Sequence, residues 1–314
     1  MALLFLGMGE PPRSDARDSA PGNDDPSHEP AIGAGSDGRR GEDHGAAMTE
    51  VEEEGEREEQ EEAEEEGGSR SVSIIIPTYN ERENIERVVD RCRAALEGYR
   101  FEIVVVDDDS PDETWRLVAD TYDGAETVRV VRRTEESGLA SAVSRGFDEA
   151  TAELCAVIDA DLQHPPERLP ELIAAFDTGA DVVIGSRHVA GGGVENWSLA
   201  RRIVSRGAMA IAKLALPPTR SIADPMSGFF AIRRGIIDGV ALAPTGYKIL
   251  LEVLLKCEYD RIAEVPYVFT ERERGESKLT AEEYLGFLSH VYELRRDGRD
   301  GRGRRIPVSV EGRQ

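Results

Sequence analysis

Two acidic residues and a nearby amide follow a short apolar run in the middle of the chain. The segment 154–165 reads LCAVIDADLQHP, so Asp159, Asp161 and Gln163 alternate directly after the run. If the backbone stays extended past Ile158, a period of two sends these three side chains to one side. Two carboxylates and an amide oxygen suit a hard divalent cation, Mg²⁺ or Mn²⁺. The alternative is a solvated acidic turn, the ordinary explanation of an isolated Asp-x-Asp pattern.

The elements around this segment decide where its side chains lie. One amphipathic helix is expected to begin at Asn80, with Glu83 completing a capping box, and others are expected over 138–150 and 167–177. Apolar strands are expected at 71–77, 102–106, 127–131, 154–158 and 181–185. This alternation is typical of βαβ units. The sequence therefore predicts a Rossmann-like α/β fold, with a mostly parallel sheet flanked by helices.

Polar clusters follow four of the five expected strands. They occupy 77–81, 107–110, 159–163 and 186–187. Open α/β sheets bind ligands at the edge formed by the carboxyl ends of their strands, so we expect one crevice lined by all four clusters. One of the three acids at 107–109 is expected to be structural, because Ser-Pro-Asp is turn chemistry.

Charge divides the chain near residue 70. The formal net charge is −24, and the first part contains an acidic run from Glu52 to Glu66. Such a segment buries too little apolar surface to offset the entropy of ordering, so 1–70 is predicted to be a disordered acidic tail. Residues 71–290 are expected to form the folded domain, and 297–314 a flexible basic tail. The acid excess and the preference for arginine over lysine suggest a proteome adapted to high salt.

Composition also argues against several kinds of site. No apolar stretch reaches the roughly 18 residues that a spanning helix needs, so we expect a protein that is soluble or peripheral at a membrane. Cys92, Cys155 and Cys257 lie far apart in apolar patterns and are expected to be buried reduced thiols. We expect no nucleic acid among the partners.

Several motifs together resemble a known family. The series PTYNE, DDDSPDET, DADLQHPPE and GSR is similar to the family 2 glycosyltransferases of GT-A fold. Further segments at 201–207, 224–230, 246–248 and 271–279 narrow the resemblance to polyprenol (dolichyl) phosphate mannosyltransferases. The likeness covers roughly 71–290, and the ordered series is specific although each motif is short.

This resemblance implies an activity and a donor site. The activity is inverting transfer of a hexose from a nucleotide diphosphate sugar to a polyprenyl or dolichyl phosphate. GDP-mannose is the expected donor and UDP-glucose the alternative. Asp159, Asp161 and Gln163 would hold Mg²⁺ or Mn²⁺, and Ala160 belongs to the same binding segment. The resemblance assigns the nucleotide pocket to Pro77, Tyr79, Glu81, Val106 and Asp108.

The implied acceptor explains why no poised general base is evident. A phosphate monoester, with a second pKa near ~6, is already ionised at neutral pH and needs cations rather than a base. The family-matched candidates around donor and acceptor phosphates are Arg187, Arg201, Arg272 and Lys278, with the Ser205 hydroxyl. Asp161, Arg187, Arg201 and Ser205 are the expected catalytic residues. His164 is expected to pack rather than to act as a base.

Two segments combine apolar and basic residues at helical spacing. Residues 199–216 and 280–296 suit helices that lie in a membrane interface, although ordinary core-packing helices would show a similar pattern. We therefore expect peripheral attachment to the cytoplasmic face of the cell membrane. A separate membrane protein is left open as a partner.

One departure from the family leaves part of the activity open. Relatives carry roughly K-x-G-L-G before the helix at 138, whereas this chain has an acid, Glu136, near the lysine position and Ala140 at the last glycine. The environment of the donor phosphates, and with it the choice of sugar, stays open. A catalytically silent nucleotide-sugar-binding protein is the alternative of another class.

Overall fold

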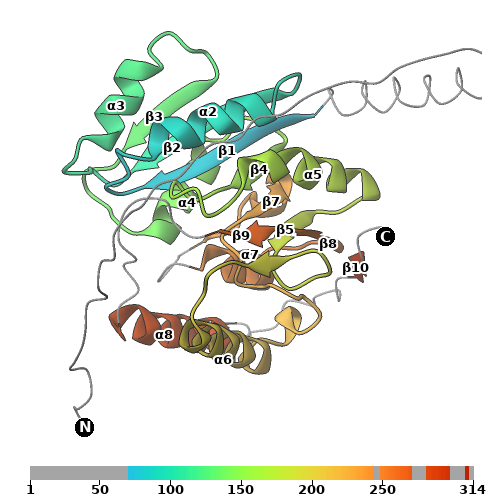
Figure 1. Cartoon of the computed structure of the whole chain (residues 1–314). Helices are drawn as coiled ribbons and strands as arrows, with labels where there is room; N and C mark the ends of the chain where they lie inside the picture. Colours follow the sequence, from blue (N-terminus) through green and yellow to red (C-terminus); the bar gives the residue numbers. More distant parts are fainter. Residues whose placement is uncertain (1–69, 243–247, 271–280, 298–307, 311–314) are drawn as a thin grey trace, which may run out of the picture. The chain divides into compact units, whose positions relative to one another are not determined.

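Short apolar runs flanked by polar turns form the central strands of the structure. The computed structural model describes residues 70–242, 248–270, 281–297 and 308–310 (Figure 1). Each strand of the first half ends in a polar turn and leads into a helix, which gives β1 Ser71–Thr78, α2 Ile85–Ala95, β2 Arg100–Asp107, α3 Thr114–Thr121, β3 Val128–Arg132, α4 Leu139–Glu149 and β4 Leu154–Val157. Arg272 and Lys278, the 1–70 tail except Arg70, and most of 297–314 lie outside the described residues.

The described residues of the second half complete the sheet and add four further helices. Its strands are β5 Val182–Ser186, β6 Gly193–Val194, β7 Phe230–Arg233, β8 Arg261–Pro266, β9 Val268–Phe269 and β10 Val308–Val310. Its helices are α5 Leu169–Ala174, α6 Leu199–Ala215, α7 Ile249–Lys256 and α8 Ala281–Asp297, with 3₁₀ turns at Pro166–Arg168, Ala175–Thr178, Pro217–Thr219 and Arg234–Ile237.

The main sheet has the order β10-β8-β5-β7-β4-β1-β2-β3. All neighbouring strands are parallel except β7, which runs antiparallel to both β4 and β5. The predicted mostly parallel α/β sheet is confirmed. The pattern of the sequence did not reveal β7, and it did not reveal that β10 pairs with β8 within a segment expected to be flexible.

Both faces of the sheet are covered, as the alternation of side chains requires. In β1, Ile74 and Ile76 pack in one apolar cluster together with α2 and α5, whereas Ile75 packs in the other together with α4 and α7. Helix α4 lies close to β1 because it presents Gly146: a Cβ there would come within 2.3 Å of Ile75 Cγ2. Cys92, Cys155 and Cys257 are buried free thiols, as predicted.

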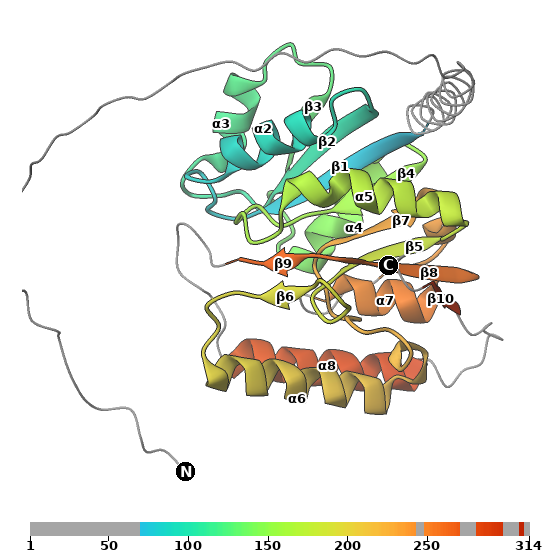
Figure 2. The ribbon, with the colours of Figure 1, turned by 45° about the vertical axis from the view of Figure 1, so that its right-hand side comes forward.

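Helices α6 and α8 lie side by side (Figures 1 and 2). Ala212 of α6 and Leu216, which directly follows this helix, join the cluster that covers one face of the sheet. Phe287 and Val291 of α8 join the same cluster. Other apolar side chains of these helices stay exposed, notably Leu199 at 74% and Leu214 at 75%. One face of these helices therefore packs in the core, as one of the two alternatives predicts, and exposed apolar side chains lie on another face.

Three local predictions are wrong. The first helix begins at Ile85 rather than after Asn80, which has φ of 56° and is pinned through its backbone N–H to Ser110 Oγ. The expected 167–177 helix is a 3₁₀ turn, the six-residue α5 and a second 3₁₀ turn. The chain also stops being extended at the end of β4, and Leu162 has φ of 62°.

Candidate active site

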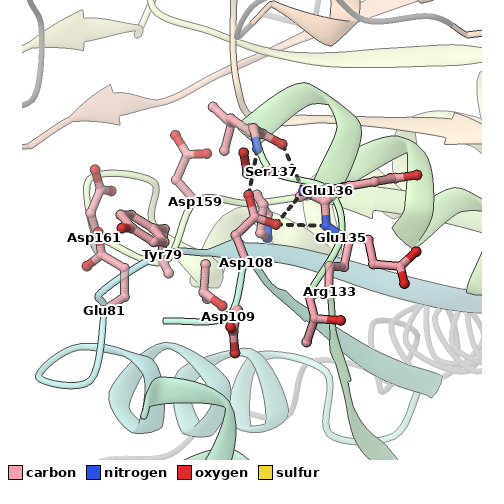
Figure 3. A pocket seen from close by; sticks show the side chains of 17 residues that line it. Tyr79, Glu81, Asp108, Asp109, Arg133, Glu135, Glu136, Ser137, Asp159 and Asp161 are labelled. Carbon is pink, nitrogen blue, oxygen red and sulfur yellow. Dashed lines mark hydrogen bonds and ion pairs between the residues drawn. The ribbon is translucent and has the colours of Figure 1, made fainter. Parts of the chain in front are cut away.

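A cavity of about 720 Å³ opens at the edge formed by the carboxyl ends of β1, β2, β3 and β4 (Figure 3). This position is the one that the polar clusters predict for a ligand crevice. The cavity is lined by Pro77, Thr78, Tyr79, Glu81, Asp108, Asp109, Arg133, Thr134, Glu135, Glu136, Ser137, Gly138, Leu139, Ala142, Asp159, Ala160 and Asp161. Of the described side chains in this lining, seven are acidic and Arg133 is the basic one.

The first two polar turns are tied together by Asp107. This fully buried carboxylate accepts hydrogen bonds from the Ser110 backbone N–H at 2.8 Å, from Ser110 Oγ at 2.7 Å and from Thr78 Oγ1 at 2.7 Å. Asp107 is therefore the structural acid expected among the three. Tyr79, held in the turn next to Thr78, is 47% exposed and lines the cavity, where its ring can stack on a nucleobase.

Asp108 positions the loop that forms another wall. Its Oδ1 accepts a hydrogen bond from Arg133 Nε at 2.7 Å, and its Oδ2 accepts one from the Gly138 backbone N–H at 2.7 Å. Arg133 is almost fully buried, and its Nη1 donates to Ser141 Oγ at 3.0 Å and lies 3.5 Å from Oε2 of the exposed Glu136. Sequence reasoning missed Arg133, although it directly follows β3 at the same sheet edge as the four clusters.

Asp159, Ala160 and Asp161 bring the acidic motif to the cavity. Figure 3 shows Asp159 and Asp161 on the side of Tyr79 and Glu81, across the cavity from the 133–138 loop. Residue 228 is a glycine, and a Cβ at this position would lie only 3.2 Å from Asp159 Oδ2. Two carboxylates that face a cavity form a donor set that fits a divalent cation.

Gln163, the third expected metal ligand, is held elsewhere. The turn at 160–162 replaces the alternation assumed from the sequence. As a result, the Gln163 backbone N–H donates to Asp161 Oδ1 at 3.1 Å, and Nε2 donates to the Thr270 carbonyl at 3.0 Å. Gln163 does not line the cavity. The described part of the chain contains no group of three or more His, Cys, Asp or Glu side chains arranged for a metal ion.

His164 is a packed, neutral imidazole. It stacks on Phe229 with ring centroids 5.5 Å apart and an interplanar angle of 14°, and its Nδ1 accepts a hydrogen bond from the Asp159 backbone N–H at 3.3 Å. Burial lowers the pKa of His164 to about 4. The expectation that His164 packs is confirmed.

Arg187 is clamped by an acid that the sequence motifs contained but did not assign. Its Nε and Nη2 donate to the two oxygens of Asp224 at 2.7 and 2.8 Å, and its backbone N–H donates to Asp224 Oδ2 at 3.1 Å. Burial opposes charging, but the hydrogen bonds and negative charge of Asp224 raise the pKa of Arg187 above its ordinary value. Glu264 fixes Asp224 in turn by accepting hydrogen bonds from the Ala223 and Asp224 backbone N–H groups.

The remaining candidates outside the cavity lining occupy two different places. Arg201 and Ser205 lie four residues apart on α6, which puts them on one face of the helix. The Arg201 guanidinium lies over the Trp197 ring, 4.4 Å from its centroid. Val106 is fully buried in β2 and packs with Val104 and Ala142. Like Arg187, none of these three lines the cavity.

Comparison with known proteins places this geometry in a family. The model of glycosyl transferase family 2 matches residues 73–240. The chain belongs to this family. The expected resemblance is therefore confirmed.

Two curated relatives carry related names. The chain is 53% identical over 223 residues to the dolichol-phosphate mannosyltransferase of Pyrococcus furiosus, a match that covers 71% of this chain and 63% of that protein. It is 36% identical over 242 residues to the polyprenol monophosphomannose synthase of Mycolicibacterium smegmatis, covering 74% of this chain and 90% of that protein.

Solved structures support the fold of the glycosyltransferase. Glucosyl-3-phosphoglycerate synthase from Mycobacterium tuberculosis, solved in complex with Mn²⁺, UDP-glucose and phosphoglyceric acid, superposes with a TM-score of 0.58 at 20% identity. The match covers 77% of this chain and 84% of that one. At this identity the likeness establishes the GT-A fold. Among its described residues, the glycosyltransferase has no helix both long and apolar enough to cross a membrane.

Proposed function

We propose that this glycosyltransferase transfers mannose, with inversion, from GDP-mannose to a polyprenyl or dolichyl phosphate. The observation that carries the proposal is the acid-lined cavity at the sheet edge, with Asp159 and Asp161 on one wall and Tyr79 beside them. The mannosyl-transferring relatives support this choice of donor and acceptor.

The donor would lie in the cavity. Tyr79 would stack on the base, and Glu81 and the backbone near Pro77 would bind polar groups of the nucleoside. Asp108 would shape the pocket by holding Arg133 and the Gly138 backbone in place, rather than by accepting a hydrogen bond from the donor. Asp159 and Asp161, with Gln163 reaching them after a change of its side-chain partner, would hold Mg²⁺ or Mn²⁺. Such a cation supplies stabilisation of the negative charge that grows on the departing diphosphate.

The acceptor would approach from the side of Arg187, Arg201 and Ser205. One oxygen of the phosphate monoester attacks the anomeric carbon, the bond from that carbon to the diphosphate oxygen breaks, and GDP leaves. Because the attacking oxygen is already ionised, no base is required, which agrees with a neutral, packed His164. Cationic side chains that gather the two anions are the main requirement. Arg272 and Lys278 are proposed for this role by family resemblance alone.

A lipid acceptor also requires contact with a membrane surface. On α6, Leu199, Ile203 and Leu214 are exposed beside the exposed Arg202 and Arg206, and on α8 Tyr292 is 67% exposed. Apolar and basic groups on paired helices suit an interfacial position. We propose peripheral attachment to the cytoplasmic face of the membrane. A separate membrane protein remains a proposed partner.

Transfer assays test the proposal directly. Purified full-length protein would be incubated with labelled GDP-mannose or UDP-glucose, polyprenyl phosphate and Mg²⁺ or Mn²⁺. Lipid-linked mannose is expected with GDP-mannose. Product with UDP-glucose alone would change the donor to the glucose nucleotide. Product with neither donor, together with nucleotide binding, would indicate a silent sugar-nucleotide-binding protein.

A further inference from the structure

Two of the arginines proposed for the acceptor lie against the same indole. The Arg201 guanidinium carbon is 4.4 Å from the centroid of the Trp197 ring, and that of Arg187 is 5.9 Å from it. Arg187 also lies 5.5 Å from the ring centroid of Phe269, which meets Trp197 edge to face at 5.6 Å. Both distances to the indole fall within the range of cation–π attraction, which is strongest for tryptophan.

The backbone places this indole by two independent constraints. Strands β6 and β9 pair in parallel, so that Val194 lies opposite Phe269, and the Glu195 backbone N–H donates to the Phe269 carbonyl at 2.9 Å. One residue after Trp197, Ser198 caps α6 by accepting a hydrogen bond from the Arg201 backbone N–H at 3.2 Å. Trp197 therefore stands between the small sheet and the first turn of α6.

Each arginine is also anchored on its own side. Arg187 comes from the end of β5 and is held by Asp224, whereas Arg201 comes from α6. Two guanidinium groups repel one another, and the electron-rich face of an indole offsets part of that repulsion. Trp197 is thus the contact shared by two cations that arrive from different elements.

We propose that Trp197 is a positioning residue that holds Arg187 and Arg201 together as a two-arginine site for the phosphate monoester of the acceptor. This inference rests on the proposed function and deepens it. Trp197 itself need not touch the phosphate, because it acts through the orientation of the guanidinium groups. Pre-oriented guanidinium groups lose less conformational freedom when they bind phosphate oxygens.

The indole nitrogen provides a way to separate two roles of the ring. Among the described residues no atom accepts a hydrogen bond from Trp197 Nε1, although this atom is buried. Trp197→Phe keeps an aromatic face and removes the N–H group, whereas Trp197→Leu removes the face as well. If stacking positions the arginines, the phenylalanine variant retains most of the acceptor affinity and the leucine variant does not.

Steady-state kinetics of the full-length chain test the inference, with GDP-mannose and polyprenyl phosphate varied separately. Loss of the cation–π attraction to the indole predicts that Trp197→Leu raises KM for polyprenyl phosphate about tenfold. KM for GDP-mannose should stay unchanged, and Trp197→Phe should raise the acceptor KM less than about threefold. An unchanged acceptor KM in Trp197→Leu, or equal increases of both KM values, would overturn the inference.

The chain offers a matched control in its other tryptophan. Trp115 also carries an arginine over its ring, with the Arg132 guanidinium carbon 3.9 Å from the centroid, but it lies on α3 and contacts neither Arg187 nor Arg201 in the described structure. Trp115→Leu should therefore leave the KM for polyprenyl phosphate as in the wild type. An increase like that of Trp197→Leu would show a general effect of losing a stacked arginine.

A binding measurement keeps this inference separate from the proposed activity, and it also serves if Trp197→Leu fails to fold. Because the chain has two tryptophans, Trp115→Phe leaves Trp197 as the single one. Its fluorescence should change on addition of a short-chain prenyl phosphate, but not of the corresponding prenol, and the response should weaken in Trp115→Phe/Arg201→Ala. Absence of a phosphate-dependent change would overturn the positioning role, whereas a wild type that binds the phosphate without transferring any hexose would count against the proposed function alone.

Discussion

Acidic side chains gather along the cavity, whereas at Arg187 opposite charges are buried against each other. Asp159 and Asp161 line a volume of about 720 Å³, but the side chain of Asp224 is fully buried and that of Arg187 is 10% exposed. A bound cation would therefore offset the negative charge of the carboxylates that line the cavity. The positive charge of Arg187 is instead balanced within the protein by Asp224, and this ion pair carries a desolvation cost. One region would be completed by a bound cation, and the other is already organised by contacts within the protein.

Loss of an acid from the cavity should have the largest effect on activity. Asp161→Ala is expected to lower kcat at least about a hundredfold, as removal of a group that stabilises transition-state charge does elsewhere. The fold should remain, because Asp161 lies outside the apolar core, and the melting temperature should fall only by the loss of the hydrogen bond from the Gln163 backbone N–H. Kinetics under added Mg²⁺ or Mn²⁺, beside thermal denaturation, measure both quantities. Full activity of this variant in excess EDTA would remove the metal from the proposal.

Loss of an acid from the buried pair should affect stability as well. Asp224→Asn leaves Arg187 charged and short of its partner, so we expect the free energy of unfolding to fall by about 3–5 kcal/mol. Urea denaturation measures the change. The matched control is Glu171→Gln, which breaks an exposed pair with Arg168 and should alter the free energy of unfolding by less than about 1 kcal/mol. Equal effects of the two substitutions would contradict the contrast between the two regions.

A second buried carboxylate on the α7–α8 side predicts a pH dependence. Burial opposes ionisation of Glu252, but hydrogen bonds from His290 and Lys256 outweigh it and lower the pKa of Glu252 from 4.5. The stabilisation from this shift is therefore complete above about pH 4.5 and is lost as the pH falls through the lowered folded-state pKa. In urea denaturation across this acid range, Glu252→Gln should lose less stability on acidification than the wild type. Parallel curves for the two proteins would refute the assignment.

Deletion of 1–69 should have the smallest effect. The cavity and the Arg187–Asp224 pair are built from residues after position 70, so we expect kcat and both KM values within about twofold of the full-length protein. Matched transfer assays on the two proteins test this. A strong loss of turnover would give the acidic segment a role in catalysis.

The sequence was sufficient for the features that depend on local pattern. Apolar runs predicted the five strands β1 to β5, and polar clusters after them predicted the edge that holds the cavity. The same patterns could not show where a turn interrupts alternation. Leu162 with positive φ directs Gln163 to the Thr270 carbonyl, a partner more than a hundred residues away.

The sequence pattern also did not predict which charged residues pair over long distances in the chain. Arg133 with Asp108, and Arg187 with Asp224, are defined by contacts between elements far apart in the chain, so spacing within a motif does not reveal them. A strand of four residues such as β7, which runs against its neighbours, also gives too weak a pattern to recognise. Sequence pattern thus located the site and its acids, and the tertiary structure supplied the orientation of its cations.

The reversed direction of β7 has a consequence for how the family can diversify. Phe230, the first residue of β7, pairs with Val157 at the end of β4, so the segment before β7 enters the sheet at the edge that holds the cavity. Changes of length between Pro217–Thr219 and Asp224 would therefore remodel the surroundings of Arg187 while the register of β1 with β2 stays intact. If Arg187 binds the acceptor phosphate as proposed, acceptor preference would change by loop insertion while the proposed nucleotide pocket stays as it is.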